Sequence, residues 1–197
     1  MANYITDRAF TDYIHRNLAL SKIYSILNWR QLNLDNSFAQ KIDMQKGIDY
    51  IFRDINGNIK TVQERFREVK YQNYSDFTIR YRRDGNIYKS RHKSEYYKIR
   101  ANYFTYGITN CYKTNLASCT DFIKFAVIDL KKVYEKIDSG DIIIEDNRQN
   151  SCIIKSNKIV CPIKYNRDGS SSFFPIEISY LVRLWGEEII VLQKGFI

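Results

Sequence analysis

The spacing of apolar residues predicts a long helix at the start of the chain. Apolar side chains recur every three or four residues, which places them on one helical face: Phe10, Tyr13, Ile14, Ile23, Ile26 and Leu27. Thr6 is a suitable N-cap residue, so we expect the helix to begin there and to end near Trp29. A shorter helix should follow, capped by Asp35 and ended by a C-cap glycine at Gly47.

After Gly47 the period changes to two residues, which predicts strands. Two of them should form a hairpin around an Asn-Gly turn, and a third, with one basic face, should continue the meander. A helix and another strand then follow. The expected ranges are 48–54, 59–70 and 77–82 for the strands of the meander, 93–101 for the helix and 103–108 for the next strand.

The second half of the chain predicts further alternation of strands and helices. Asp129 is placed to cap one helix, and Pro175 to occupy the first turn of the last one. The expected strands are 122–128, 142–144, a hairpin at 152–161, and 189–192, and the helices are 130–137 and 176–185. The sequence therefore predicts an α/β fold in a single domain, 1–197, with a mixed central sheet flanked by helices. Its core should span about residues 6–128, with a β-rich C-terminal extension at about 129–197.

Lysine and arginine are concentrated in one part of the chain. The formal net charge is +9, and the segment from Arg53 to Arg100 holds thirteen Lys or Arg against six Asp or Glu. Tyrosines such as Tyr71, Tyr81 and Tyr97 alternate with these cations. Clustered cations displace counterions from a phosphate backbone, and aromatic rings stack on bases. We therefore expect a nucleic-acid partner, and the alternative is a solvated basic face whose tyrosines pack half-buried on a sheet.

The four cysteines show no C-x-x-C spacing. A two-residue turn at Ser156-Asn157 would place Cys152 directly across from Cys161. These two thiols could bind zinc together with Cys111 and Cys119, could form a disulfide, or could pack unpaired as small apolar groups, which we favour.

The hairpin at 48–70 carries the candidate chemistry. The length of its loop decides which residue of the second strand faces Asp49. With a two-residue loop, Asp49 faces Glu64, and the two carboxylates form a metal site. With a three-residue loop containing a left-handed glycine, Asp49 faces Gln63, which supplies a carbonyl oxygen, and Arg65 is the neighbouring cation. Oxygen ligands of this kind suit a hard cation such as Mg²⁺. An ordinary cross-strand ion pair between Asp49 and Arg65 is the structural alternative.

This hairpin resembles the PD-(D/E)xK nuclease superfamily, which includes many restriction endonucleases and Holliday-junction resolvases. The matching stretch is Gly47-Ile48-Asp49, then thirteen residues, then Gln63-Glu64-Arg65. It is similar to the variant in which Gln and Lys, two residues apart, replace the usual Glu and Lys. The order helix, three strands, helix, strand also fits, and the resemblance covers roughly residues 6–110. It implies a restriction-endonuclease-like core.

The resemblance also implies a Mg²⁺-dependent endonuclease, of the restriction type, that hydrolyses DNA phosphodiester bonds with a metal-activated water. Carried onto this chain, Asp49 is a metal ligand and Gln63 or Glu64 is the second one. Arg65 occupies the position of the family's lysine. Because arginine stays protonated, it can hold phosphate but cannot take a proton from water. Lys70, within Glu68-Val69-Lys70, is the alternative for that position.

DNA, as a duplex, is the expected partner, and a homodimer is implied by the resemblance. The residues expected to line the duplex are Arg67, Lys70, Arg80, Arg82, Lys98 and Arg100. A non-catalytic DNA- or RNA-binding protein on the same scaffold is the alternative function, and an interaction protein with a basic surface is a third. The two histidines, His15 and His92, lack the Cys or Ser neighbours of a nucleophilic site. With no signal peptide and no stretch of ~18 apolar residues, we expect a soluble, cytoplasmic protein without a membrane partner.

Overall fold

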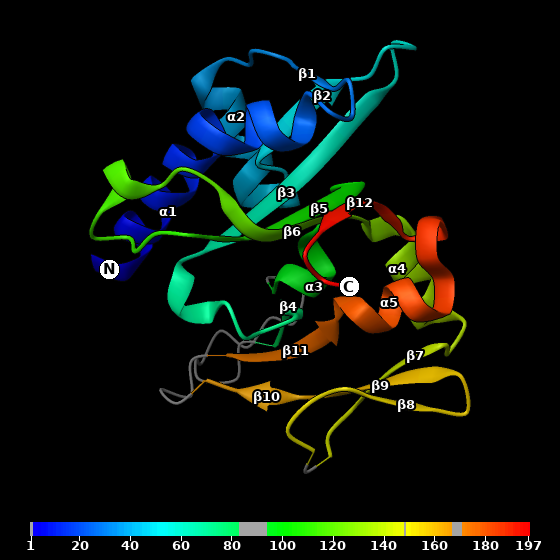
Figure 1. Ribbon diagram of the computed structural model, residues 1–197. Helices are drawn as coiled ribbons and strands as arrows, with labels where there is room; N and C mark the ends of the chain where they lie inside the picture. The colour runs from blue at the N-terminus through cyan, green and yellow to red at the C-terminus, as the bar shows by residue number, and fades with distance from the viewer. Residues whose placement is uncertain (1, 83–93, 148, 167–170) are drawn as a thin grey trace.

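A mixed six-stranded sheet forms the centre of the fold (Figure 1). The computed structural model describes residues 2–82, 94–147, 149–166 and 171–197. Neighbouring strands in this sheet are antiparallel except β3 and β5, which run parallel. In sheet order, the strands are β1 (Arg30–Gln31), β2 (Tyr50–Arg53), β3 (Ile59–Arg67), β5 (Tyr103–Thr109), β6 (Phe122–Asp129) and β12 (Ile190–Lys194).

One face of this sheet is covered by the N-terminal helix. α1 (Ala2–Ile14) continues directly into η1 (His15–Tyr24), which has π-helical hydrogen bonding. Their buried side chains pack against sheet residues that alternate along the strands. This core includes Phe10, Ile14, Leu18 and Ile23 of the helix and Phe52, Val62, Phe66, Phe125 and Val127 of the sheet. The predicted long helix is confirmed, but both predicted ends are wrong. The chain turns at Asn28, whose φ of +55° ends the helical path before Trp29.

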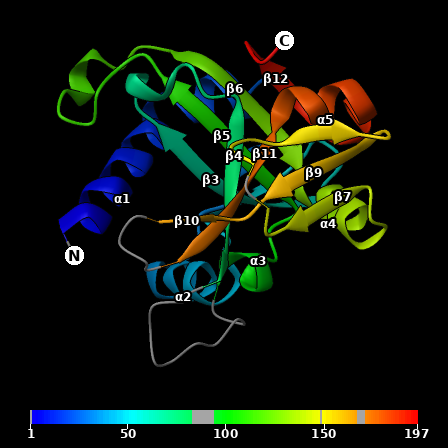
Figure 2. The ribbon, with the colours of Figure 1, turned by 90° about the horizontal axis from the view of Figure 1, so that it is seen from below.

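The other face is covered by a second sheet and three helices (Figure 2). The second sheet has the order β10 (Lys164–Tyr165), β11 (Ser172–Glu177), β4 (Asp76–Arg82). The helices are α3 (Glu95–Lys98), α4 (Leu130–Asp138) and α5 (Ile178–Trp185). Phe77 of β4 packs on Phe104 of β5 with ring centroids 5.2 Å apart. Apolar side chains from both layers form the larger core of the molecule.

The predicted three-strand meander is wrong. β4 lies close to its predicted range and alternates as expected, since Phe77 and Ile79 are buried and Arg80 is exposed. It leaves the central sheet, however, and pairs with β11. β3 ends at Arg67, and the short helix η2 (Val69–Tyr71) turns the chain beneath the sheet, so that β5 takes the place beside β3.

The helix caps around the hairpin are confirmed. α2 (Asn36–Lys46) begins at Asp35, whose carboxylate accepts hydrogen bonds from the amides of Ser37 and Phe38. It ends at Gly47, which has a φ of +57°. Because a left-handed C-cap residue ends the helix there, the chain enters the strand β2 within three residues.

The C-terminal part adds a strand to each of the two sheets described above: β12 lies at the edge of the central sheet, and β11 lies in the middle of the second sheet. Asp129 caps α4 as predicted, by accepting from the amide of Lys132. Pro175 is not in a helix but in β11, opposite Thr78, and α5 begins three residues later.

α3 is shorter than predicted, and residue 93 of that prediction lies outside the described residues, as does His92. The remaining elements are η4 (Leu116–Ser118), η5 (Gly186–Glu188), and a sheet of β7 (Ile142–Glu145), β9 (Lys158–Pro162) and β8 (Ile153–Lys155).

The cysteines form two separate pairs rather than one cluster. Cys152 and Cys161 lie opposite each other, as the two-residue turn predicts, and their Sγ atoms are 3.6 Å apart as buried free thiols. Cys111 and Cys119 form a disulfide, which the sequence prediction missed. The loop between β5 and β6 folds back through η4 and brings these two residues together. Because the two pairs lie in different cores, the alternative of one four-cysteine zinc site is wrong.

The structure thus confirms an α/β fold with a mixed multi-strand sheet flanked by helices. Among its described helices, none has the length and apolar character needed to cross a membrane.

Candidate functional site

The β2–β3 hairpin adopts the register that the three-residue loop predicts, and its paired part begins at Tyr50, one residue after Asp49. Tyr50 pairs with Val62, and the amide of Asp49 donates to the carbonyl of Val62 over 2.9 Å. Asp54 and Asn58 close a three-residue loop in which Gly57 has a φ of +85°. This is the second of the two predicted registers. Side chains at Gln63 and Arg65 therefore share one face of β3, and Glu64 lies on the opposite face.

Asp49 lies at the start of the hairpin, and its carboxylate has two partners. Oδ2 accepts from the backbone amide of Glu64 over 2.7 Å, and Oδ1 lies 3.4 Å from Nη1 of Arg8 on α1. The same Arg8 nitrogen donates to Asp43 Oδ2 over 2.9 Å. The Arg8 guanidinium thus pairs with three carboxylates, because its Nε also lies 3.1 Å from Asp12 Oδ1, and the Asp49 side chain is only 7% exposed.

The surroundings of Asp49 do not fully stabilise its negative charge. Burial, followed by repulsion from Asp43, raises the pKa of Asp49 to about 7, although the Glu64 amide and Arg8 act in the opposite direction. A buried carboxylate with a pKa this high is typical of functional sites, where a bound cation or substrate completes the charge balance.

Gln63 contributes a buried oxygen that lacks a hydrogen-bond partner. Among the described residues, none donates to its Oε1. The amide packs against Gly47, where an added Cβ would lie 2.8 Å from Oε1 and 3.1 Å from Ile99 Cγ1. Buried acceptors are rarely left unsatisfied, so this unpaired oxygen, on the residue between the two backbone partners of Asp49, is a candidate ligand oxygen.

We expect Gly47→Ala to destabilise the protein by about 2 kcal/mol or more, because it adds left-handed strain to a close contact with Gln63. A urea unfolding curve would measure the loss. Gly140→Ala is the matched control, since Gly140 has a φ of +76° but nothing lies within 4 Å of its added Cβ. Equal losses for the two variants would show that the Gln63 contact contributes nothing.

Glu64 belongs to a buried polar network on the other face of β3. Its Oε1 lies 2.9 Å from His15 Nδ1 and accepts from the Tyr24 hydroxyl over 2.5 Å, and its Oε2 lies 3.1 Å from the same His15 nitrogen. Tyr24 also contacts Thr105 Oγ1 at 2.9 Å. Burial and the Glu64 carboxylate hold the pKa of Tyr24 well above its ordinary value, so the hydroxyl stays protonated. Both oxygens of Glu64 are therefore engaged by the protein itself.

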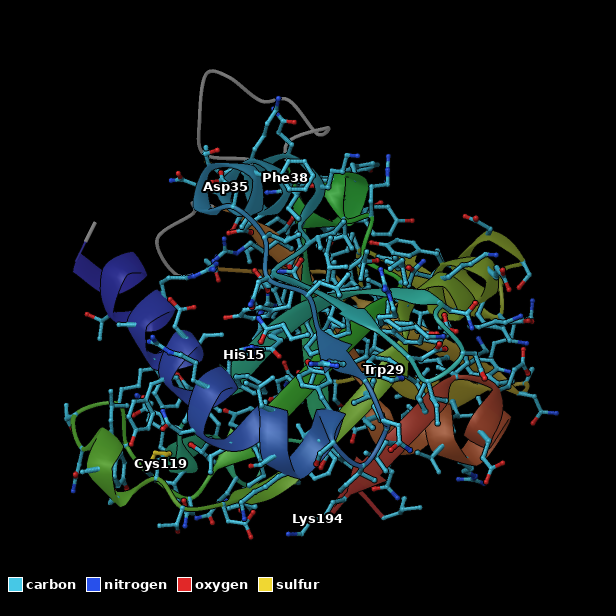
Figure 3. All side chains as sticks on the ribbon, turned by 90° about the horizontal axis from the view of Figure 1, so that it is seen from above. His15, Trp29, Asp35, Phe38, Cys119 and Lys194 are labelled. Atoms are coloured by element: carbon cyan, nitrogen blue, oxygen red, sulfur yellow. A yellow bond between two sulfur atoms is a disulfide. The ribbon has the colours of Figure 1, made fainter. Side chains whose placement is uncertain are left out.

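His15 connects this network to the surface. Figure 3 shows it on the blue N-terminal helix, beside the strands of the sheet. Its ring stacks on Tyr50 at a centroid distance of 3.5 Å, and its Nε2 lies 3.2 Å from Gln31 Oε1. A cavity of about 350 Å³ opens next to it. The residues lining this cavity are Arg8, Asp12, His15, Arg16, Gln31 and Tyr50.

Arg65 is held by partners beneath the sheet. Its guanidinium donates to Glu95 of α3 and to the carbonyl of Thr78 on β4, and it lies 5.6 Å from the Phe104 ring. Glu95 also accepts from the Arg80 amide over 2.8 Å. Burial acts to lower the pKa of Arg65, but Glu95, together with Tyr106 and Asp49, outweighs burial and raises the pKa above its ordinary value. The cation expected beside Asp49 is therefore permanently charged and firmly positioned.

The residues predicted to line DNA lie on several elements. Lys70 is on η2 rather than on β3, and it pairs with Glu68. Arg67 stacks over Tyr71 and Tyr106, with centroids 5.1 and 5.7 Å from its guanidinium carbon. Arg80 and Arg82 are on β4. Lys98 is the last residue of α3, and Arg100 lies two residues after it.

Sequence reasoning missed Arg8, His15, Tyr24, Asp43 and Glu95. For Arg8 and His15 the helical spacing was a signal. Arg8, Asp12 and His15 are spaced by four and three residues and therefore share one helical face. Glu95 gave no local signal, since its partner Arg65 is thirty residues away. Glu64, expected as a metal ligand, is found in the His15–Tyr24 network.

Asp49 and Gln63 present oxygen atoms of the kind that suits a hard cation. Gln63 Oε1 is unpaired, whereas each Asp49 oxygen already has one partner, the Glu64 amide or Arg8. Across the part of the chain that the structure describes, no group of three or more His, Cys, Asp or Glu side chains is arranged to hold a metal ion. Water or substrate oxygens would have to complete the coordination of an ion at Asp49 and Gln63. In comparisons with known proteins, no family model, no curated sequence and no solved structure matches this chain.

Proposed function

We propose that the protein is a Mg²⁺-dependent DNA endonuclease with a restriction-endonuclease-like core, and that Asp49 and Gln63 hold the metal ion. The observation that carries the proposal is that Asp49 hydrogen-bonds to the backbone of Val62 and of Glu64, on either side of Gln63, whose buried Oε1 is unpaired. Arg65 follows on the same face of β3, as the Gln-x-Lys variant of the nuclease pattern requires of its cation.

Each residue then has a defined task. Asp49 and Gln63 supply ligand oxygens, and Arg65 stabilises the negative charge on the phosphate while Glu95 positions it. When bound, Mg²⁺ supplies an activated water and offsets charge on the phosphodiester. Arg8 pairs with Asp12, Asp43 and Asp49, so an incoming cation must compete with its guanidinium.

A second function is favoured by a separate observation. Both oxygens of Glu64 are already hydrogen-bonded, and Arg65 is already ion-paired with Glu95. Two of the three side chains expected to do chemistry are thus engaged within the protein. A DNA-binding protein without cleavage activity would have the same arrangement.

Cleavage of supercoiled plasmid DNA in Mg²⁺ tests the proposal. We expect the wild type to cut and Asp49→Asn to lose about a hundredfold or more in rate, because a ligand oxygen and its charge are removed. Gln63→Glu should cut at lower Mg²⁺ concentration, since a carboxylate binds the ion more tightly than an amide. Asp138→Asn, an exposed residue at the end of α4, is the matched control and should behave as wild type.

The outcomes separate the two functions. A wild type that binds DNA but does not cut it with Mg²⁺ or Mn²⁺ supports the binding protein. Cleavage that survives Asp49→Asn at the wild-type rate would show that the metal lies elsewhere.

A further inference from the structure

A second, larger groove borders the cavity beside His15. It encloses about 760 Å³ and runs along the short edge strand β1. Trp29, Leu32 and Ile55 provide apolar surface, and Ser25, Asn28 and Gln31 provide polar groups. Such a mixture of flat apolar surface and hydrogen-bonding groups suits a nucleotide, whose base is apolar on its faces and polar on its edges.

Two arginines make this groove a candidate site for anions, and the one carboxylate among its described lining residues, Asp54, pairs with Lys60. Arg30 and Arg53 are direct cross-strand partners on β1 and β2, both are exposed, and both line the groove. In the described chain, neither has a carboxylate within ion-pair distance. Like charges directly opposite on neighbouring strands repel, so a bound anion between them would relieve the repulsion.

The groove and the cavity beside His15 share one lining residue. Gln31 lines both of them, and its Oε1 contacts His15 Nε2. Beyond Gln31, the cavity is lined by two further arginines, Arg16 and Arg8, and Arg8 contacts Asp49. Four arginines therefore line the two neighbouring hollows, Arg30 and Arg53 in the groove and Arg16 and Arg8 in the cavity.

We propose that the path formed by Arg53, Arg30, Arg16 and Arg8 binds the phosphates of one DNA strand and leads it to Asp49. The inference rests on the proposed function, since it names the route by which the substrate reaches that site. It also places the DNA on a different surface from the one predicted from sequence, which included Arg67 and Lys70.

The chain contains a matched control for the two groove arginines. Lys155 and Lys158 are also exposed like-charged cross-strand partners, on the β8–β9 hairpin, and they line neither the groove nor the cavity. Replacing either pair by alanine removes the same charge. A general effect of net charge on DNA binding would therefore affect both double variants equally.

The test is fluorescence anisotropy with a labelled 20-base-pair DNA duplex in EDTA, over a series of NaCl concentrations. For Arg30→Ala/Arg53→Ala we expect the Kd to rise about tenfold and the slope of log Kd against log salt to fall by about two, because two phosphate contacts are lost. Arg30→Lys/Arg53→Lys should keep most of the slope, which controls for folding. Lys155→Ala/Lys158→Ala should bind as wild type.

The results distinguish this inference from the proposed nuclease activity. Equal losses in the two alanine variants, or no loss in either, would overturn the path. An effect seen only with an RNA duplex of the same sequence would overturn the assignment to DNA. Because the assay contains no metal, a wild type that shows the expected slopes but never cuts DNA would support the path and reject the nuclease.

Discussion

The His15→Leu variant should unfold about 6–12 °C below the wild type and lose about 3 kcal/mol of stability. The substitution keeps a side chain of similar size but leaves the Glu64 carboxylate with Tyr24 as its only side-chain donor. The Glu64 side chain is 0% exposed and that of His15 is 1% exposed, so water cannot replace the lost partner. A buried charge that loses its partner is among the most destabilising changes a protein can undergo.

Thermal and urea unfolding followed by circular dichroism at pH 7 would measure this loss. The double variant His15→Leu/Glu64→Leu should recover most of it, because it removes the buried charge together with its partner. Arg16→Leu, at the next position and exposed, should change stability by less than about 0.5 kcal/mol. If the single and the double variant were equally unstable, the network would not be the cause.

Arg65→Met should have the second largest effect, again about 3 kcal/mol. Glu95 loses the guanidinium that offsets its burial, and the carbonyl of Thr78 loses a donor. A double-mutant cycle with Glu95→Gln should give a coupling energy of about 2 kcal/mol, because the two side chains contact each other directly.

Arg67→Met is the matched control for this cycle. Arg67 lies two residues along the same face of β3, stacks on tyrosines, and has no carboxylate at ion-pair distance among the described residues. We expect a loss near 1 kcal/mol and no coupling to Glu95. Coupling as large as that of Arg65 would mean that the whole basic face, rather than one ion pair, holds α3 in place.

The sequence was most informative where local rules decide the structure. The Asp35 and Gly47 caps, the Asp129 cap and the alternation along β4 each follow from a few neighbouring residues. The two hairpin registers could be written down in advance, but the choice between them depended on the loop around Gly57.

The rest depended on contacts between distant segments. Nothing near Phe77 indicates that β4 leaves the sheet to pair with β11, almost a hundred residues later. Glu64 could be placed on a strand, but its face and its partners are set by a helix about forty residues away. For the same reason Asp49 could be selected from sequence, whereas its contact with Arg8, forty-one residues away, could not.

The π-helical segment η1 explains how one helix supplies both partners of Glu64. His15 and Tyr24 are nine residues apart, which is two and a half turns of an α-helix with 3.6 residues per turn. An α-helix would thus direct them to opposite sides. With the wider turn of a π-helix, nine residues are close to two turns, and both side chains reach the same carboxylate. Deleting a single residue between them would restore α-helical winding and separate the pair. The number of residues between His15 and Tyr24 is therefore as constrained as the identity of these two residues.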